Sequence, residues 1–154
     1  MIKRFLIVIT IFFTSSCGFK VINYSELGNF EISSISSSGD KRINFGIKNK
    51  LLASSKKGGS IFEVEFSSKK IKEIKEKNIK NEITKYEVSV SIDAKFTDTL
   101  NKNRYQFKKT LSGDYSVAKQ YSQTLNNEKK ILELLTNKIA EELLNEIVIK
   151  VNAI

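Results

Sequence analysis

The sequence predicts an α+β fold, in which a four-stranded, mostly antiparallel sheet carries two helices packed on one face. Three observations lead to this prediction. Apolar and polar residues alternate strictly over residues 86–96, which is the period of a half-buried strand. From about residue 119 to residue 149 the apolar residues instead recur three, four or seven positions apart, as in a helix. The length of 154 residues suits one domain of ordinary size.

The first two elements should be a short strand and a helix. The apolar positions of the strand are Phe30, Ile32 and Ile35. This strand, over residues 30–35, loses its period in the serine run over residues 33–38, and we expect the end of that run to be a loop that closes at Gly39 and Asp40. Asp40 can cap a helix that starts at Lys41, because its carboxylate can accept hydrogen bonds from the first unpaired amides. The inner face of that helix would carry Ile43, Ile47 and Leu51.

A second strand is predicted over residues 61–66, where large apolar residues alternate with glutamates. Six lysines and two glutamates follow within residues 69–80. We interpret this segment as a twisted or bulged strand that runs into a protruding hairpin. A short helix is the alternative, because Ile71 and Ile74 have helical spacing.

The strictly alternating strand over residues 86–96 should have one buried face and one wet face. A polar turn over residues 98–103 leads to a further strand, in which Lys109 interrupts the apolar face. The apolar residues of this last strand are Tyr105, Phe107 and Leu111. Two strands joined by a short polar connection predict an antiparallel hairpin.

The helix over residues 119–149 would reach about 45 Å and could lie across the whole sheet. Its apolar stripe contains Tyr121, Leu125, Leu132, Leu135, Ile139, Leu143 and Ile147. Because each strand has only one apolar face, both helices should pack on the same side. The other face carries Glu, Ser, Asp and Lys, so it should meet water or a polar partner surface.

The first seventeen residues have the order of a bacterial lipoprotein signal. Lys3 and Arg4 precede an apolar run over residues 5–13 that is too short to span a bilayer. The single cysteine, Cys17, follows a few small residues later, where lipoproteins carry their diacylglycerol. We therefore expect a signal peptide over residues 1–16, a lipidated tether over residues 17–29 and a single domain over residues 30–154.

Two alternatives apply to this segment. It could stay uncut as a membrane anchor, or it could be a signal peptide that contains a cysteine by chance. Thr14 departs from the cleavage motif, which usually has Leu, Val or Ile at that position. Gly18 after the cysteine, in place of Asp, favours the outer membrane over the inner one. We expect the protein on the periplasmic side of the cell outer membrane, held in its lipid by the acylated Cys17.

Composition excludes several kinds of chemistry. Without His and with one Cys, the chain can form no internal disulfide, Cys/His zinc site or Ser-His-Asp triad. Ser-x-x-Lys occurs three times, as chance allows in a chain rich in both residues, so we expect neither an enzyme nor a cofactor. Loss of Lys3 and Arg4 lowers 26 basic residues to 24, which against 17 acidic residues leaves +7. Outside the cytoplasm this charge favours lipid phosphates, lipopolysaccharide or an acidic protein lumen, and no nucleic acid.

Five segments follow one another along the chain: the start CGF at residue 17, IFEVEFSS, TKYEVSVSIDAKFTD, YQFKKTLSGDYSV and the helix QYSQTLNNEKKILELLTNKIAEELL. This series resembles the LptE family of lipopolysaccharide-assembly lipoproteins of Gram-negative bacteria. The resemblance implies a sheet of four strands with two helices and no catalysis. It also implies that the protein plugs and helps to assemble the LptD β-barrel and contacts lipopolysaccharide on its way to the outer leaflet.

The lysine-rich segment is the candidate for that contact. Lipid A phosphates are multiply charged, and Lys75, Lys77 and Lys80 would lie near the tip of the predicted hairpin. The alternative is an ordinary solvated Lys/Glu surface. For the protein as a whole, the alternative functions are a generic outer-membrane lipoprotein with a structural or scaffolding role and, more remotely, a small periplasmic hydrolase.

Overall fold

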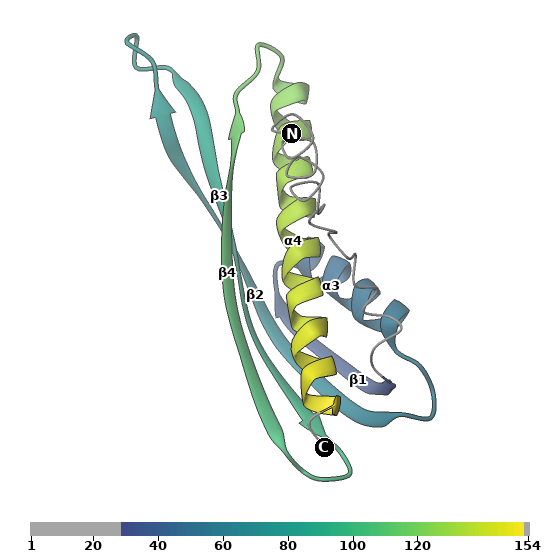
Figure 1. Ribbon diagram of the computed structural model, residues 1–154. Helices are drawn as coiled ribbons and strands as arrows, with labels where there is room; N and C mark the ends of the chain where they lie inside the picture. The colour runs from purple at the N-terminus through teal and green to yellow at the C-terminus, as the bar shows by residue number, and fades with distance from the viewer. Residues whose placement is uncertain (1–28, 153–154) are drawn as a thin grey trace, which may run out of the picture.

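The computed structural model describes residues 29–152, which form one sheet and two helices. In chain order the elements are β1 (Phe30–Gly39), α3 (Lys41–Ser54), β2 (Ser60–Lys77), β3 (Ile83–Asp98), β4 (Arg104–Ser116) and α4 (Tyr121–Asn152). The strand order is β1-β2-β3-β4, in which β1 is parallel to β2 and the other neighbours are antiparallel. Both helices cover the same face of the sheet (Figure 1), so the predicted α+β fold is confirmed. The predicted signal peptide, Cys17 and the predicted tether up to residue 28 lie outside the described residues.

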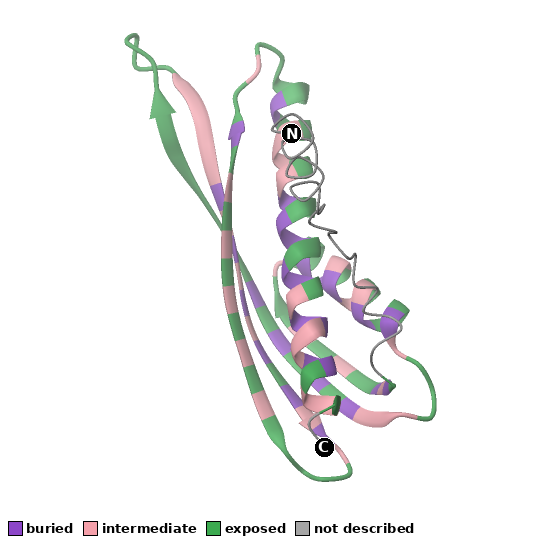
Figure 2. Cartoon of the chain, in the orientation of Figure 1, coloured by how far each residue is buried: buried purple, intermediate pink, exposed green. Residues whose placement is uncertain are grey.

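The core lies between the sheet and the helices. Helix α4 lies over β3 and β4, and α3 lies over β1 and β2. Buried residues alternate with exposed ones along the first part of β2 and mostly with half-buried ones along β3 (Figure 2). The largest buried side chains are Phe30, Phe62, Phe66, Phe96, Ile43, Ile47, Leu51, Ile139, Leu143, Leu144 and Ile147. Burial of each of these side chains contributes about 1.5–3 kcal/mol to the free energy of folding. This hydrophobic burial holds the sheet and the helices together.

Strand β1 is longer than the sequence predicts. The end of the serine run does not form a loop, because Ser36–Ser38 pair with Glu65–Ser67 of the parallel neighbour β2. A register shift lies between Ile32 and Ser34, where the hydroxyl of Ser33 donates to the carbonyl of Phe62 at 3.2 Å. The backbone bonds to β2 outweigh the weak strand preference of serine, and this contribution of a distant neighbour is invisible in the local pattern.

Strand β2 runs on to Lys77, so the protruding hairpin is confirmed and the short helix is wrong. Ile71 and Ile74 have helical spacing, but in the strand they lie on opposite faces. The pairing with β3 becomes irregular between Ile74 and Lys77. From Lys69 onward no residue of β2 is buried, and Figure 1 shows the β2–β3 hairpin projecting beyond the rest of the sheet.

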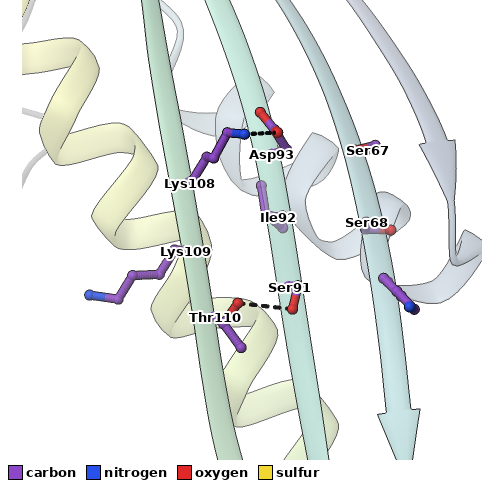
Figure 3. A pocket seen from close by; sticks show the side chains of 9 residues that line it. Ser67, Ser68, Ser91, Ile92, Asp93, Lys108, Lys109 and Thr110 are labelled. Atoms are coloured by element: carbon purple, nitrogen blue, oxygen red, sulfur yellow. Dashed lines mark hydrogen bonds and ion pairs between the residues drawn. The ribbon is translucent and has the colours of Figure 1, made fainter.

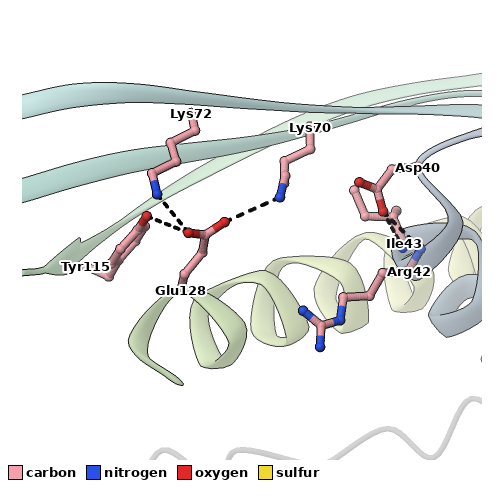
Figure 4. Close-up of polar contacts among 7 residues, drawn as sticks. All are labelled: Asp40, Arg42, Ile43, Lys70, Lys72, Tyr115 and Glu128. Atoms are coloured by element: carbon pink, nitrogen blue, oxygen red, sulfur yellow. Dashed lines mark hydrogen bonds and ion pairs between the residues drawn. The ribbon is translucent and has the colours of Figure 1, made fainter. Parts of the chain in front are cut away.

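The two helices begin close to where the sequence predicts. Asp40 caps α3, since its carboxylate accepts hydrogen bonds from the amides of Arg42 at 2.9 Å and Ile43 at 3.1 Å (Figure 4). Helix α4 buries its apolar stripe only from Leu132 onward. The first two positions of the predicted stripe are instead exposed, Tyr121 by 76% and Leu125 by 46%, because the first turns of α4 extend past the core. Within residues 29–152, neither helix has the length and apolar character needed to cross a membrane.

Candidate functional site

The projecting hairpin is ordered by its own turn. The side-chain oxygen of Asn78 accepts hydrogen bonds from the amides of Lys80 at 2.9 Å and Glu82 at 3.0 Å, and its amide donates to the Glu82 carboxylate at 2.7 Å. Asn81 has a φ of 64°, the left-handed conformation that asparagine tolerates better than most residues. Local hydrogen bonds therefore fix the shape of the tip without help from the core.

The structure separates the three candidate lysines into two groups. Lys75 lies on the face of the sheet away from the helices, where it forms ion pairs with Glu87 at 3.0 Å and Asp114 at 2.6 Å. Hydrogen bonds to these two carboxylates raise the pKa of Lys75. Its charge is therefore already compensated within the sheet.

Lys77 and Lys80 lie at the tip itself. The ammonium group of Lys77 donates to the side-chain oxygen of Asn81 at 3.0 Å, a neutral partner. Lys80 is exposed and forms no ion pair within residues 29–152. The neighbouring Ile79 is fully exposed, so the tip presents two uncompensated cations beside one apolar side chain.

A cluster at the base of the hairpin joins it to α4, and we call it the root cluster: Lys70, Lys72, Tyr86, Tyr115 and Glu128. The Glu128 carboxylate pairs with the ammonium groups of Lys72 at 2.8 Å and Lys70 at 3.3 Å (Figure 4). The Tyr115 hydroxyl donates to the same carboxylate at 2.8 Å. Lys72 also lies over the Tyr86 ring, 4.2 Å from its centre, while the rings of Tyr86 and Tyr115 stack at 5.6 Å.

The protonation states of the root cluster are set by these contacts. Burial opposes ionisation of Glu128, but hydrogen bonds from Lys72, Tyr115 and Lys70 outweigh it and lower the pKa of Glu128 to about 2. Burial likewise opposes the charge on Lys72, yet its bonds to Glu128 and Tyr115 raise its pKa. Both groups stay charged near neutral pH, so the cluster is suited to hold the hairpin and not to transfer protons.

The sheet face away from the helices, which we call the open face, is polar as the sequence predicts. Ladders of side-chain contacts cross it from strand to strand (Figure 3). They include Ser89–Ser112 at 2.8 Å, Ser91–Thr110 at 2.9 Å and the ion pair Asp93–Lys108 at 2.8 Å. One hollow of about 360 Å³ is lined in part by Ser67, Lys69, Asp93 and Lys108, and a second of about 620 Å³ in part by Ser34, Glu63, Lys95 and Arg104.

The sequence predicts the positions of Lys77 and Lys80 at the hairpin tip and the polar open face, whereas Lys75 lies below the tip and the root cluster was missed. Lys72 and Glu128 are 56 residues apart, and each stands in a stretch of ordinary Lys/Glu composition. No local signal distinguishes them from solvated surface residues. The proposed lipid-attachment residue, Cys17, lies outside the described residues and stays a prediction.

No protein-family model matches the sequence, and no curated protein matches it. Solved structures do match. A putative lipoprotein from Caulobacter crescentus aligns with a TM-score of 0.59 at 14% identity, covering 84% of this chain and 95% of that chain. Rare lipoprotein B from Shewanella oneidensis aligns with a TM-score of 0.57 at 10% identity, covering 76% and 95%.

A third match is an uncharacterized lipoprotein B from Nitrosomonas europaea, with a TM-score of 0.56 at 12% identity, covering 85% of this chain and 90% of that chain. At identities this low the agreement concerns the path of the chain and not its individual residues. The described domain has the fold of these bacterial lipoproteins.

Proposed function

We propose that this protein is an outer-membrane lipoprotein of the LptE kind, which occupies the lumen of an LptD-type β-barrel and takes part in lipopolysaccharide transport. The observation that carries the proposal is the shared fold: three bacterial lipoproteins align with this chain over 90–95% of their own lengths. The lipoprotein-like N-terminus ending at Cys17 and the LptE-like segments of the sequence point in the same direction.

The open face supports a partner of this kind. Barrel lumens are polar, so a plug needs a polar exterior that exchanges hydrogen bonds and ion pairs with the wall. The open face offers hydroxyl groups, carboxylates and ammonium groups in mixed order, and its hollows leave room for side chains of a partner. An extended apolar patch on this face would have argued against a polar partner.

The projecting hairpin supports the lipopolysaccharide contact. Lys77 and Lys80 are exposed at its tip without a carboxylate partner among the described residues, so each can meet a phosphate as a point charge. Lys75 contributes less, because Glu87 and Asp114 already neutralise it.

Co-purification tests the barrel partner. The tagged protein is captured from solubilised outer membranes of its own bacterium after mild cross-linking. We expect a large β-barrel protein to elute with it, and depletion of the protein to reduce lipopolysaccharide export. Recovery of the protein alone, together with unaffected export, would contradict the proposal and leave the scaffolding alternative.

Charge reversal at the tip tests the lipopolysaccharide contact. The Lys77→Glu/Lys80→Glu variant should bind lipopolysaccharide at least several-fold more weakly than the wild type while unfolding at the same denaturant concentration. The matched control is Lys95→Glu/Lys102→Glu, which makes the same change of charge towards the other end of β3. Equal loss of binding in both variants would show that net charge, and not the tip, governs the interaction.

A further inference from the structure

The outer face of α3 and the loop after it form a second cationic surface, remote from the hairpin. From Lys41 to Lys57 the chain carries six basic residues and no acidic one. Lys50 pairs with Glu141 of α4 at 3.1 Å. The other five form no ion pair within the described part of the chain, residues 29–152; they are Lys41, Arg42, Lys48, Lys56 and Lys57. Figure 4 shows the Arg42 side chain extending from the start of α3 without a partner among the residues drawn.

Two large apolar side chains lie among these cations. Phe45 is 68% exposed and Leu52 is 55% exposed. At 3.6 residues per turn, Leu52 lies about 20° from Phe45 around the helix, and Arg42 and Lys48 lie about 60° to either side. The core-facing residues Ile43, Ile47 and Leu51 lie on the opposite side and are fully buried. Packing in the core therefore does not explain why Phe45 and Leu52 are apolar.

The basic residues at the start of α3 do not stabilise the helix either. Lys41 and Arg42 stand in the first turn of α3, and no acidic residue accompanies them there. The helix dipole makes this end positive, so cations at these positions oppose it, and Asp or Glu would be preferred. An external anionic surface would reverse that disadvantage.

The chain enters the domain next to this surface. The carbonyl of Asn29 accepts a hydrogen bond from the amide of Ser60 at 3.0 Å, and the carbonyl of Phe30 accepts one from the amide of Lys56 at 2.8 Å. Asn29 lies twelve positions after Cys17, and such a segment spans at most about 40 Å when extended. An acylated Cys17 would therefore hold this entry point, beside the loop that follows α3, within about 40 Å of the lipid that holds the acyl chains.

We propose that the outer face of α3, together with Lys56 and Lys57, docks on anionic phospholipid headgroups of the leaflet in which Cys17 is anchored. The five unpaired cations meet the headgroup phosphates, and Phe45 and Leu52 enter the boundary between headgroups and acyl chains. This inference rests on the lipid anchor of the proposed function, and it requires neither the barrel nor lipopolysaccharide. It assigns α3 to the membrane surface and leaves the hairpin at the far end of β2 free for another ligand.

The test places a fluorescent reporter on α3 of the mature, lipidated protein. Because acylation occupies the only native cysteine, Leu52→Cys provides a unique thiol for an environment-sensitive dye. Lys95→Cys, on the open face, is the matched control site. Both labelled proteins are bound to vesicles of phosphatidylcholine alone or of phosphatidylcholine with phosphatidylglycerol, and neither vesicle contains a barrel or lipopolysaccharide.

We expect a blue shift of the dye at position 52 only in the vesicles that contain phosphatidylglycerol, and no shift at position 95. Arg42→Gln/Lys48→Gln, which should fold normally because Arg42 is exposed and Lys48 only half-buried, should abolish the shift. High salt should also abolish the shift by screening the cations.

Equal emission at positions 52 and 95, or a blue shift of the same size in both kinds of vesicle, would overturn the docking. Neither result would affect the co-purification test of the barrel partner. A protein that floats with neither vesicle lacks the anchor, which would contradict the proposed function itself and remove the docking with it.

Discussion

Glu128 is the residue on which the attachment of the hairpin to α4 depends most. Its carboxylate is partly buried and receives hydrogen bonds from Lys72, Lys70 and Tyr115. A carboxylate that loses water without such donors becomes protonated, whereas this one is held ionised. The sequence could not predict this arrangement, because the partners come from β2, β4 and α4 and meet only when the sheet and the helix have packed.

The low pKa of Glu128 gives a stability that depends on pH. The folded-state pKa is about 2, against an ordinary value of 4.5. Because the folded value is depressed, the stabilisation is complete above about pH 4.5 and is lost as the pH falls towards 2. We expect Glu128→Gln to lower the free energy of unfolding by about 1–2 kcal/mol at neutral pH, after allowance for solvent screening. Urea unfolding at neutral pH and at about pH 3 measures the difference, which should shrink at the lower pH.

Glu133→Gln is the matched control, since Glu133 is exposed on the same helix and lies 3.9 Å from Lys129. Its free energy of unfolding should stay close to that of the wild type at both pH values. Identical behaviour of the two variants would show that the root cluster adds no stability beyond that of a surface ion pair.

At the scale of elements, the sequence predicts well wherever one strand face or one helix face is buried. Strand β3 and most of α4 lie where their periodicity places them, and the Asp40 cap of α3 is found as predicted. The errors occur where pairing with a distant neighbour decides the conformation. The serines of β1 join the sheet because the backbone of β2 offers them hydrogen-bond partners. A charged residue is tolerated at position 109, on the side of β4 that faces the helices, because Lys109 forms an ion pair with Glu142 of α4 at 2.6 Å.

The end of β1 depends on a glycine. Gly39 has a φ of +97°, and a Cβ atom there would lie 1.9 Å from the carbonyl oxygen of Ser68 in the neighbouring strand. We expect Gly39→Ala to lower the free energy of unfolding by more than about 3 kcal/mol, because the strain of a positive φ and the backbone clash add together.

Gly58→Ala is the control, since its φ of +93° is similar but no heavy atom lies within 4 Å of the added carbon. That variant should cost only about 1 kcal/mol in the same denaturation experiment. Equal costs would mean that the close approach of β1 and β2 is unimportant.

At the scale of the whole molecule, the protein divides into a packed body and a projecting hairpin. None of residues 75–85 is buried, whereas β3 from Val88 to Phe96 supplies the core from every second position. The sequence predicts this division through the change from alternating apolar residues to a lysine-rich run. The sequence does not predict that ion pairs compensate the charge of Lys75, because its partners Glu87 and Asp114 come from two other strands.

Shortening the hairpin tests whether the two parts are independent. Ile74 pairs with Tyr86, so an Asn-Gly turn can replace residues 75–85 and close the strands directly. We expect the free energy of unfolding to change by less than about 1 kcal/mol, since no buried side chain is removed. Lipopolysaccharide binding should fall as it does in the tip variant. Loss of cooperative unfolding would instead show that the hairpin belongs to the core.

The parallel pairing of β1 with β2 has a consequence for the order in which the domain assembles. Strands β2, β3 and β4 are consecutive antiparallel neighbours, so short connections bring them together at little cost in chain entropy. Strand β1 pairs across α3, with Phe30 opposite Ser60, and must wait until that helix has formed and turned the chain back. We therefore expect the segment that follows the predicted lipid anchor to be the last to be incorporated, so that the edge formed by β1 stays incomplete until the helical crossover is in place.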